Sequence, residues 1–389
     1  MALTPQQQAL QNKIDVLDSS ASTSTLLGLL VQSLDEGKII WSYDSSGQIP
    51  VDSDYHGMIH FTHDSDKIRF VGTSSKVHLL DSQDTAPPGV TSAPYQGSIS
   101  GYSAGGINPA VSPTVTNVIQ KFSLTADEDA TDVGNLTQII HKNISTGSTT
   151  HGYRAGGAQP GTQNVIDKWS FTSDGNATDV GDLTSNREYA TSFDTVTHGY
   201  SVSGLSSPNT YSNIIEKYAY ASDGNATDVG DTSTPRYSQT GIFSEDNGYA
   251  VGGVSVPEGS PFWKSDIQKM PFASEGDTTD LTDTLPIGRA NSAPNNSTTH
   301  GYISGGEEPA TRNTIFKYAF AEGADATDIG DLQQASTRSA GSNSTTHAYI
   351  TGGTPNSNII QKLPFATDED TTDVANLLST VRYGAGTQI

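Results

Sequence analysis

Three histidines lie close together near the N-terminus and could bind a metal ion. His56, His60 and His63 occur in the segment HGMIHFTH. Imidazole is a common ligand of transition metals, but the chain has no cysteine, and no nearby pattern of carboxylates completes a coordination shell. We therefore expect polar histidines on an exposed strand rather than a metal site.

Acidic turns could supply oxygen ligands for Ca²⁺. They are Asp127-Glu128-Asp129, Asp174-Gly175-Asn176, Asp223-Gly224-Asn225 and Asp368-Glu369-Asp370. Their spacing matches neither an EF-hand loop nor a glycine-rich nonapeptide repeat, whereas Asp, Gly and Asn are ordinary hairpin residues. The sequence predicts hairpin turns at these positions, with no bound metal and no other cofactor.

One irregular segment, SVPEGSPFWKS, carries aromatic residues that we expect to be exposed. It contains Phe262, Trp263 and Lys264. Aromatic rings stack on the apolar faces of sugars and anchor protein interfaces. These three residues are the predicted binding site, and a packed loop anchor is the alternative interpretation.

Catalytic patterns are missing from the sequence. No isolated pair of carboxylates, Ser-His-Asp set or phosphate-binding loop stands out from the rest of the chain. The absence of cysteine also removes thiol nucleophiles, thiolate zinc sites and disulfides. We expect a protein that is not an enzyme.

The elements that must position these residues come from an internal repeat of roughly 50 residues. Each copy begins with an apolar strand that carries a tyrosine and ends in small residues, as in HGYRAGG. The six tyrosines are Tyr102, Tyr153, Tyr200, Tyr249, Tyr302 and Tyr349. One four-stranded blade for each copy predicts an all-β, six-bladed β-propeller.

Each copy continues with a second strand, a turn rich in Gly, Asp and Asn, a short third strand such as TDVGD, and a fourth strand. In five copies the fourth strand follows an arginine, and the first copy has His141-Lys142 there instead. The arginines are Arg187, Arg236, Arg289, Arg338 and Arg382.

Two charged positions also recur in every copy. The lysines are Lys121, Lys168, Lys217, Lys269, Lys317 and Lys362, and the aspartates are Asp132, Asp179, Asp228, Asp280, Asp328 and Asp373. A ligand site seldom needs six equivalent residues, so we expect structural ion pairs or turn caps. We assign the tyrosines and the paired glycines to structure as well, and expect the glycines to let strands approach near the central channel.

The two ends of the repeat region complement each other. The last segment, STVRYGAGTQI, aligns with the segment that precedes each tyrosine strand. We therefore expect the C-terminal strand to join the first blade, which would remove exposed sheet edges.

The N-terminal residues differ in character from the repeats. Leu10, Ile14 and Leu17, and then Leu26, Leu30 and Leu34, have helical spacing. Residues 1–36 are predicted to form two short helices that need a partner to be stable, for docking or oligomerisation. Residues 37–83 are predicted to form a small β module, and residues 84–389 the propeller.

Composition limits the partners and the surroundings. The 389 residues include 20 Lys and Arg against 43 Asp and Glu, a formal net charge of −23, which disfavours nucleic acid and anionic membranes. No secretory signal is evident, and no apolar run approaches the roughly 18 residues of a membrane span.

The repeat resembles the kelch repeat, through its apolar strand, double glycine and the segment Thr234-Pro235-Arg236-Tyr237. The resemblance covers about residues 90–389 and implies a propeller fold but no single chemistry. The chain departs from the kelch pattern in the third strand, where T-D-V-G replaces the usual tryptophan.

The N-terminal segment TSTLLGLLVQSLDEG and the DGNATDVGDL repeats resemble parts of virion structural proteins of marine tailed bacteriophages. This resemblance implies a virion protein of the tail or capsid, a fibre or decoration. Its N-terminus would dock to the particle as a homo-oligomer, and its propeller would bind host-surface glycan or another virion protein. A glycan-active propeller enzyme and a bacterial surface or secreted adhesin are the alternatives.

Overall fold

The computed structural model describes residues 97–110, 114–206, 210–255, 262–321 and 323–389, together with four strands nearer the N-terminus. The chain divides into two compact units, Met1–Pro88 and Gly89–Ile389. The division falls within SQDTAPPGV, close to the predicted boundary between the small β module and the propeller. No helix in the described part of the chain is long and apolar enough to span a membrane.

The first unit contains one four-stranded sheet. Its strands, in sheet order, are β1 (Ile40–Tyr43), β2 (Ile59–Thr62), β3 (Lys67–Val71) and β4 (Val77–Leu80). β1 and β2 are parallel, and the other two pairs are antiparallel. The predicted helices over residues 1–36, with Leu10, Ile14, Leu17, Leu26, Leu30 and Leu34, lie outside the described residues, so their docking role stays a prediction.

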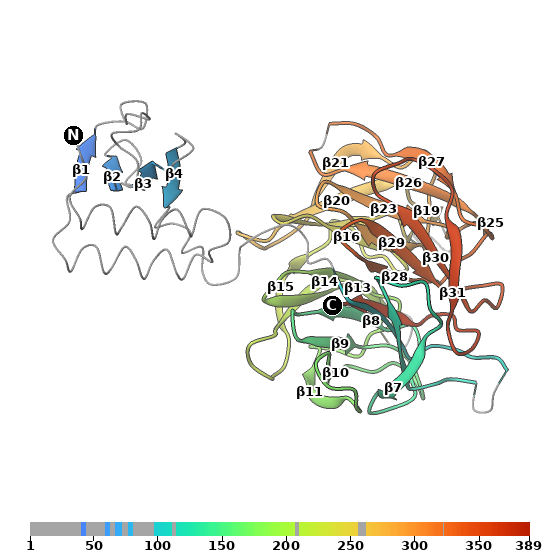
Figure 1. Ribbon diagram of the computed structural model, residues 1–389. Coiled ribbons are helices and arrows are strands. Elements are labelled where there is room, and N and C mark those ends of the chain that lie inside the picture. The colour runs from blue at the N-terminus through green and yellow to red at the C-terminus, as the bar shows by residue number, and fades with distance from the viewer. Residues whose placement is uncertain are drawn as a thin grey trace. The chain divides into compact units, whose positions relative to one another are not determined.

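The second unit is a six-bladed β-propeller (Figure 1), as the repeat predicts. Each blade is a four-stranded antiparallel sheet. In order around the ring, the blades are blade 1 (β32-β5-β6-β7), blade 2 (β8 to β11), blade 3 (β12 to β15), blade 4 (β16-β17-β20-β21), blade 5 (β22-β23-β26-β27) and blade 6 (β28 to β31).

The strands fall into four classes by their place in the blade. The innermost strands are β8 (Ile144–Gly147), β12 (Thr191–Asp194), β16 (Thr240–Phe243), β22 (Ala293–Asn296), β28 (Ala340–Asn343) and β32 (Ala385–Gln388). The second strands are β5 (Ser100–Ala104), β9 (His151–Ala155), β13 (His198–Ser206), β17 (Asn247–Val251), β23 (His300–Ser304) and β29 (His347–Thr351). The third strands are β6 (Val118–Ser123), β10 (Val165–Ser170), β14 (Thr210–Ala219), β20 (Asp266–Pro271), β26 (Thr314–Ala319) and β30 (Ile359–Pro364). The outer strands are β7 (Thr131–Asn135), β11 (Thr178–Asp182), β15 (Thr227–Asp231), β21 (Thr279–Thr284), β27 (Thr327–Asp331) and β31 (Thr372–Asn376).

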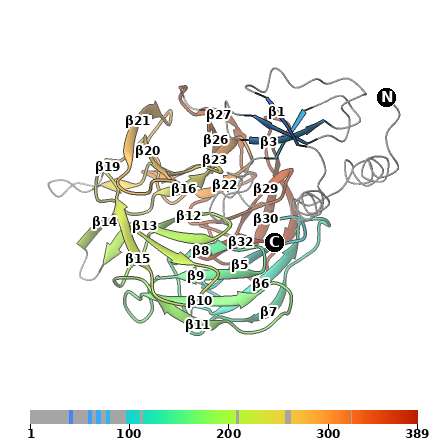
Figure 2. The same ribbon diagram turned by 90° about the vertical axis from the view of Figure 1, so that its left-hand side faces the viewer.

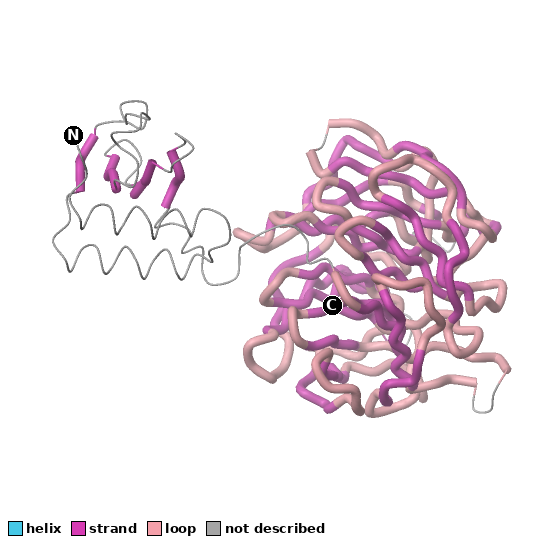
Figure 3. Tube along the Cα trace, in the orientation of Figure 1, coloured by secondary structure: helices cyan, strands magenta, loops and turns pink. Residues whose placement is uncertain are grey.

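Two short hairpins extend the loops between second and third strands. They are β18 (Val254–Ser255) with β19 (Phe262–Trp263), and β24 (Glu307–Glu308) with β25 (Ala310–Thr311). Strands and loops make up all of the described structure, in which no helix occurs (Figure 3).

Each blade combines the last strand of one sequence repeat with the first three strands of the next. Blade 1 therefore depends on both ends of the second unit: β32 pairs with β5, from Ala385 opposite Ala104 to Gln388 opposite Gly101. β32 also contacts the innermost strands β8 and β28 on either side, near the C-terminus in Figure 2. The predicted closure of the ring is confirmed.

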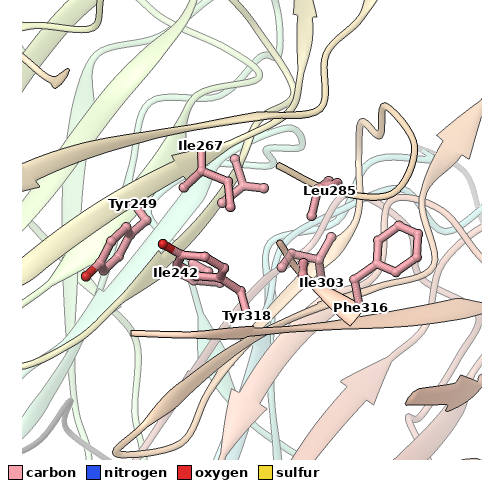
Figure 4. Packing of buried hydrophobic residues seen from close by; sticks show 9 residues of the cluster. Ile242, Tyr249, Ile267, Leu285, Ile303, Phe316 and Tyr318 are labelled. Atoms are coloured by element: carbon pink, nitrogen blue, oxygen red, sulfur yellow. The ribbon is translucent and has the colours of Figure 1, made fainter. Parts of the chain in front are cut away.

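The hydrophobic core lies between neighbouring blades, as Figure 4 shows for blades 4 and 5. Ile242 and Tyr249 of blade 4 pack with Ile303 and Tyr318 of blade 5, and all four side chains are fully buried. The six repeat tyrosines are likewise buried. Since each core is shared between two blades, no blade can bury its apolar faces alone.

The paired glycines follow the second strand and form a turn with positive φ, such as 68° at Gly105 and 105° at Gly106. They also allow a close approach of neighbouring backbone, since a Cβ at Gly106 would lie 2.9 Å from the carbonyl oxygen of Arg382. The N–H of Gly106 donates to the carbonyl of Ile140 at 2.7 Å. The glycines are needed because an L side chain would be strained in this conformation.

The recurring charged residues connect blades or close turns, as predicted. Interblade ion pairs with N–O distances of 2.6–3.0 Å are Lys121–Asp174, Lys168–Asp223, Lys217–Glu275, Lys317–Asp368 and Lys362–Asp127. Four of the recurring aspartates accept the backbone N–H of the glycine two residues later, as Asp132 does from Gly134 at 3.1 Å. The acidic turns thus have protein partners, and the described residues contain no group of three or more side chains that could hold a metal ion.

Candidate binding site at the channel mouth

Six residues at one repeat position have left-handed backbone conformations. Each lies two residues before an innermost strand, and their φ angles lie between 55° and 64°, a region that residues other than glycine seldom occupy. We call them the mouth ring: Lys142, Tyr189, Ser238, Asn291, Arg338 and Tyr383.

Backbone hydrogen bonds join the mouth ring into a closed circle. The N–H of each member donates to the carbonyl of the member in the preceding blade, at 2.8–3.1 Å. The circle closes where the N–H of Lys142 reaches the carbonyl of Tyr383. These bonds stabilise an otherwise unfavourable backbone conformation. Because they use only the main chain, the six side chains are free to differ.

A depression lies inside the mouth ring. Its empty volume is about 710 Å³ with the open solvent at its mouth included. Its wall continues to the first half of the innermost strands, at residues such as Ser145, Ser192 and Gly386. None of the final residues of these six strands, all of which the structure describes, lines it. The lining residues therefore lie at the mouth end of the innermost strands.

Two cations stand at the rim, and each has a carboxylate partner. The Nζ of Lys142 lies 3.0 Å from Glu188 and 4.4 Å from the centroid of the Tyr189 ring. Arg338 lies 3.4 Å from Glu307 and stands 5.0 Å over the Tyr383 ring. Both cations are therefore paired with an anion and a tyrosine.

Tyrosines form a continuous cluster beside these cations. Tyr189 and Tyr383 meet edge to face with centroids 5.6 Å apart, and their hydroxyl oxygens are 3.2 Å apart. Tyr237 packs against Tyr189 at 5.8 Å, and Tyr211 stacks on Tyr237 at 5.7 Å. Burial raises the pKa of both Tyr189 and Tyr383, so both hydroxyls keep their protons at neutral pH.

Next to the tyrosines, burial lowers the pKa of His141 to about 4, and the neighbouring Lys142 and Arg382 add to the effect. The His141 imidazole is therefore neutral at physiological pH, and it adds no positive charge to the rim.

The position after the mouth ring supplies a second set of lining residues. It holds Asn143, Ala190, Gln239, Ser292, Ser339 and Gly384. Ser292 and Ser339 each donate to a backbone carbonyl of their own blade, of Gly305 and Gly352. The side-chain amides of Asn143 and Gln239 have no hydrogen-bond partner at either the oxygen or the nitrogen, although Gln239 is only 6% exposed.

The predicted aromatic site borders this mouth. Phe262 is 54% exposed and Trp263 is half-buried. Trp263 pairs with Val254, and Val254 exchanges two backbone hydrogen bonds with Tyr237. The N–H of Lys264 donates to the carbonyl of Gly253 at 2.9 Å. The structure places Phe262, Trp263 and Lys264 beside the tyrosine cluster, and their role in binding stays a prediction.

Each of the five arginines precedes a fourth strand, as predicted, but they do not share one structural position. Arg187, Arg236 and Arg289 occupy one buried position, as their carbonyls accept from equivalent glycines. Arg338 lies two residues later in its repeat, in the mouth ring, and Arg382 one residue later. The place of a residue in its repeat is defined by the main chain, not by the charge of its side chain. Two markers define it: the left-handed residue before the fourth strand, and the carbonyl two residues earlier that accepts the glycine N–H.

This shift explains why the sequence pattern missed the mouth ring. No single residue type is common to its six members. They share only their position, two residues before the fourth strand. A search for unlike residues at an otherwise regular repeat position would have found Tyr189, Tyr383, Lys142 and Arg338.

Fold and site together define a closed six-bladed propeller with a polar, aromatic depression at the mouth of its channel. No protein-family model matches the chain, and no curated protein matches its sequence. The proposal of function below is therefore based on the geometry of the site.

Proposed function

We propose that this protein is a non-enzymatic binding protein whose propeller recognises glycan through the depression inside the mouth ring. The observation that supports this best is the contrast between backbone and side chains. Six equivalent backbone positions present five different residue types around one depression, whereas the recurring lysines and aspartates form interblade ion pairs or turn contacts.

The charges at the mouth favour binding over hydrolysis. The residues that line the depression, all of them described, include no Asp or Glu. Glu188 and Glu307 do not line the depression, and they are paired with Lys142 and with Asn291 and Arg338. A glycosidase needs two carboxyl groups that flank the scissile bond, so the alternative of a glycan-active enzyme has less support.

The cellular setting rests on sequence resemblance. The likeness to kelch repeats and to virion proteins of marine tailed bacteriophages leads us to propose a virion surface protein of tail or capsid. Its N-terminal unit would attach it to other virion proteins as a homo-oligomer. A bacterial adhesin would use the same mouth. Detection of the protein in purified, intact phage particles by antibody labelling would distinguish the two.

The test of glycan binding uses two variants that the repeat itself suggests. Tyr189→Ser and Tyr383→Asn place at these positions the residues that Ser238 and Asn291 provide in the same backbone conformation. We expect both variants to fold, and to bind cell-surface polysaccharide about tenfold more weakly or worse, because each loses an aromatic contact. Unchanged binding by both folded variants would remove the mouth as the glycan site.

A further inference from the structure

We propose that the mouth binds an uncharged saccharide, and that the amides of Asn143 and Gln239 bind its hydroxyl groups. This inference rests on the proposed function and narrows it to one class of glycan. It starts from the two unpaired amides, which interrupt an otherwise satisfied position of the repeat.

An unpaired amide in a buried environment is costly. A buried polar group that loses its hydrogen bonds to water without replacing them lowers the stability of the fold. The same position can be satisfied within the blade, as Ser292 and Ser339 show. Asn143 and Gln239 are longer and lie on the wall of the depression, so a ligand in the depression would supply the partners that their own blades do not.

The chemistry of an amide selects the kind of ligand. Each amide offers one acceptor oxygen beside one donor nitrogen. Neighbouring sugar hydroxyls, which donate and accept, complement both atoms at once. A carboxylate only accepts, so the amide oxygens would face it unfavourably. The Tyr189 and Tyr383 pair adds a phenolic proton and apolar ring surface.

The charges at the mouth also favour an uncharged ligand. Lys142 and Arg338 are each paired with a glutamate, so neither is an uncommitted cation. The whole chain has a formal net charge of −23, which repels an anionic ligand over distances comparable to the Debye length. An uncharged saccharide avoids this repulsion.

The experiment compares one polysaccharide in two charge states. Oligosaccharides of galacturonic acid, and the same oligosaccharides after chemical reduction of each carboxyl group to a hydroxymethyl group, are titrated into the full-length protein by calorimetry at low and high salt. A neutral panel of glucose, mannose and galactose oligosaccharides is measured in parallel. We expect binding to uncharged saccharides only, with little dependence on salt.

The variants Asn143→Ser and Gln239→Ser introduce the residue that Ser292 and Ser339 provide at this position, so folding should be retained. We expect each to weaken binding of the uncharged saccharide about tenfold. Gln163→Ser is the matched control: its amide donates to the carbonyl of Gly161 in the loop after the second strand, and it does not line the depression.

The outcomes separate the inference from the proposed function. Preference for the acidic forms, with affinity that falls as salt rises and is lost in Tyr189→Ser, would overturn the inference and leave glycan binding at the mouth intact. Loss of affinity in Gln163→Ser equal to that in the two amide variants would also overturn it. If no saccharide binds, or if Tyr189→Ser binds all of them normally, both the inference and the proposed function fail.

Discussion

Blade 2 contains a buried ion pair at a place where blades 1, 4, 5 and 6 have neutral side chains. Arg154 and Asp167 lie opposite each other in register, 2.6 Å apart, and neither is exposed. In blade 1 the same pair of positions holds Ser103 and Gln120. The carboxylate also accepts the backbone N–H of Thr137 in the preceding blade, as Gln120 accepts that of Leu378.

We predict that Arg154→Ser alone lowers the free energy of unfolding by about 3–5 kcal/mol, because it leaves the Asp167 carboxylate buried without its cation. The double variant Arg154→Ser/Asp167→Gln should recover most of this loss, because it recreates the pair of blade 1. Urea unfolding of both variants measures the effect. A double variant no more stable than the single one would show that the ion pair is needed for packing in blade 2.

Asp194 at the end of β12 makes stability depend on pH. It accepts the backbone N–H of Gly147 at 2.7 Å and the hydroxyl of Tyr220 at 2.5 Å, and burial raises its pKa to about 8 against those hydrogen bonds. The folded protein therefore binds a proton at Asp194 more tightly than the unfolded chain does. The protonated Asp194 carboxyl group stabilises the folded state fully below about pH 4, and this stabilisation is lost as the pH rises toward 8.

Asp194→Asn should remove this dependence, because Asn296 and Asn343 fill the same role in other blades by accepting a backbone N–H. We expect the melting temperature of the variant to change less between pH 5 and pH 9 than that of the original protein. Calorimetric scans at both pH values test this. Parallel pH profiles for the two proteins would mean that other groups cause the dependence.

Alanine substitutions of Phe262 and Trp263 should distinguish a role in binding from a role in the stability of the fold. Phe262 is exposed, whereas Trp263 is half-buried and pairs with Val254. We predict that Phe262→Ala leaves the melting temperature unchanged and, if the loop contributes to binding, weakens adsorption by about 1–3 kcal/mol. Trp263→Ala should also lower stability. Full adsorption by both variants in binding assays would confine recognition to the mouth ring.

At the scale of elements, the propeller depends on one four-residue strand for its closure. β32 completes blade 1 and contacts the innermost strands of both neighbouring blades. The backbone of Ile389 also accepts hydrogen bonds from the N–H groups of Ser98, Ile99 and Ser100. Without this strand, β5 would become an open edge.

Deletion of residues 385–389 should therefore lower the melting temperature by more than roughly 10 °C, which corresponds to several kcal/mol in a domain of this size. The surface ion pairs provide the comparison. Lys121→Met breaks a pair whose aspartate side chain is 54% exposed, and should cost less than about 1 kcal/mol. Equal melting temperatures for the deleted and complete chains would place the essential closure elsewhere.

At the scale of the whole molecule, the chain divides into two compact units, and we expect docking and saccharide binding to reside in different units. We predict that residues 89–389 alone fold and bind saccharide like the full chain, because every lining residue of the depression belongs to this unit. The shortened protein should fail to join phage particles, if residues 1–36 mediate docking. Light scattering measures the oligomeric state of both proteins, and incorporation into particles measures attachment. Normal incorporation of the shortened protein would contradict a docking role for residues 1–36.

The sequence by itself determined the number of blades and the closure of the ring. Both follow from a repeat in which the buried tyrosines recur with their strands, and from two chain ends that each hold part of one repeat. Such patterns are visible because local strand alternation and core packing constrain residue types in every copy. The interblade role of the lysines followed from the same regularity.

Only the tertiary structure decided where the candidate site lies. Lys142 and Tyr383 are far apart in the chain, and they meet because the backbone circle closes around the channel. The circle constrains φ and the hydrogen bonds of the main chain but not the side chains, so the ring has no common residue type to detect. Arg338 shows the consequence: its charge suggests the position of Arg187, whereas the left-handed turn places it at the mouth.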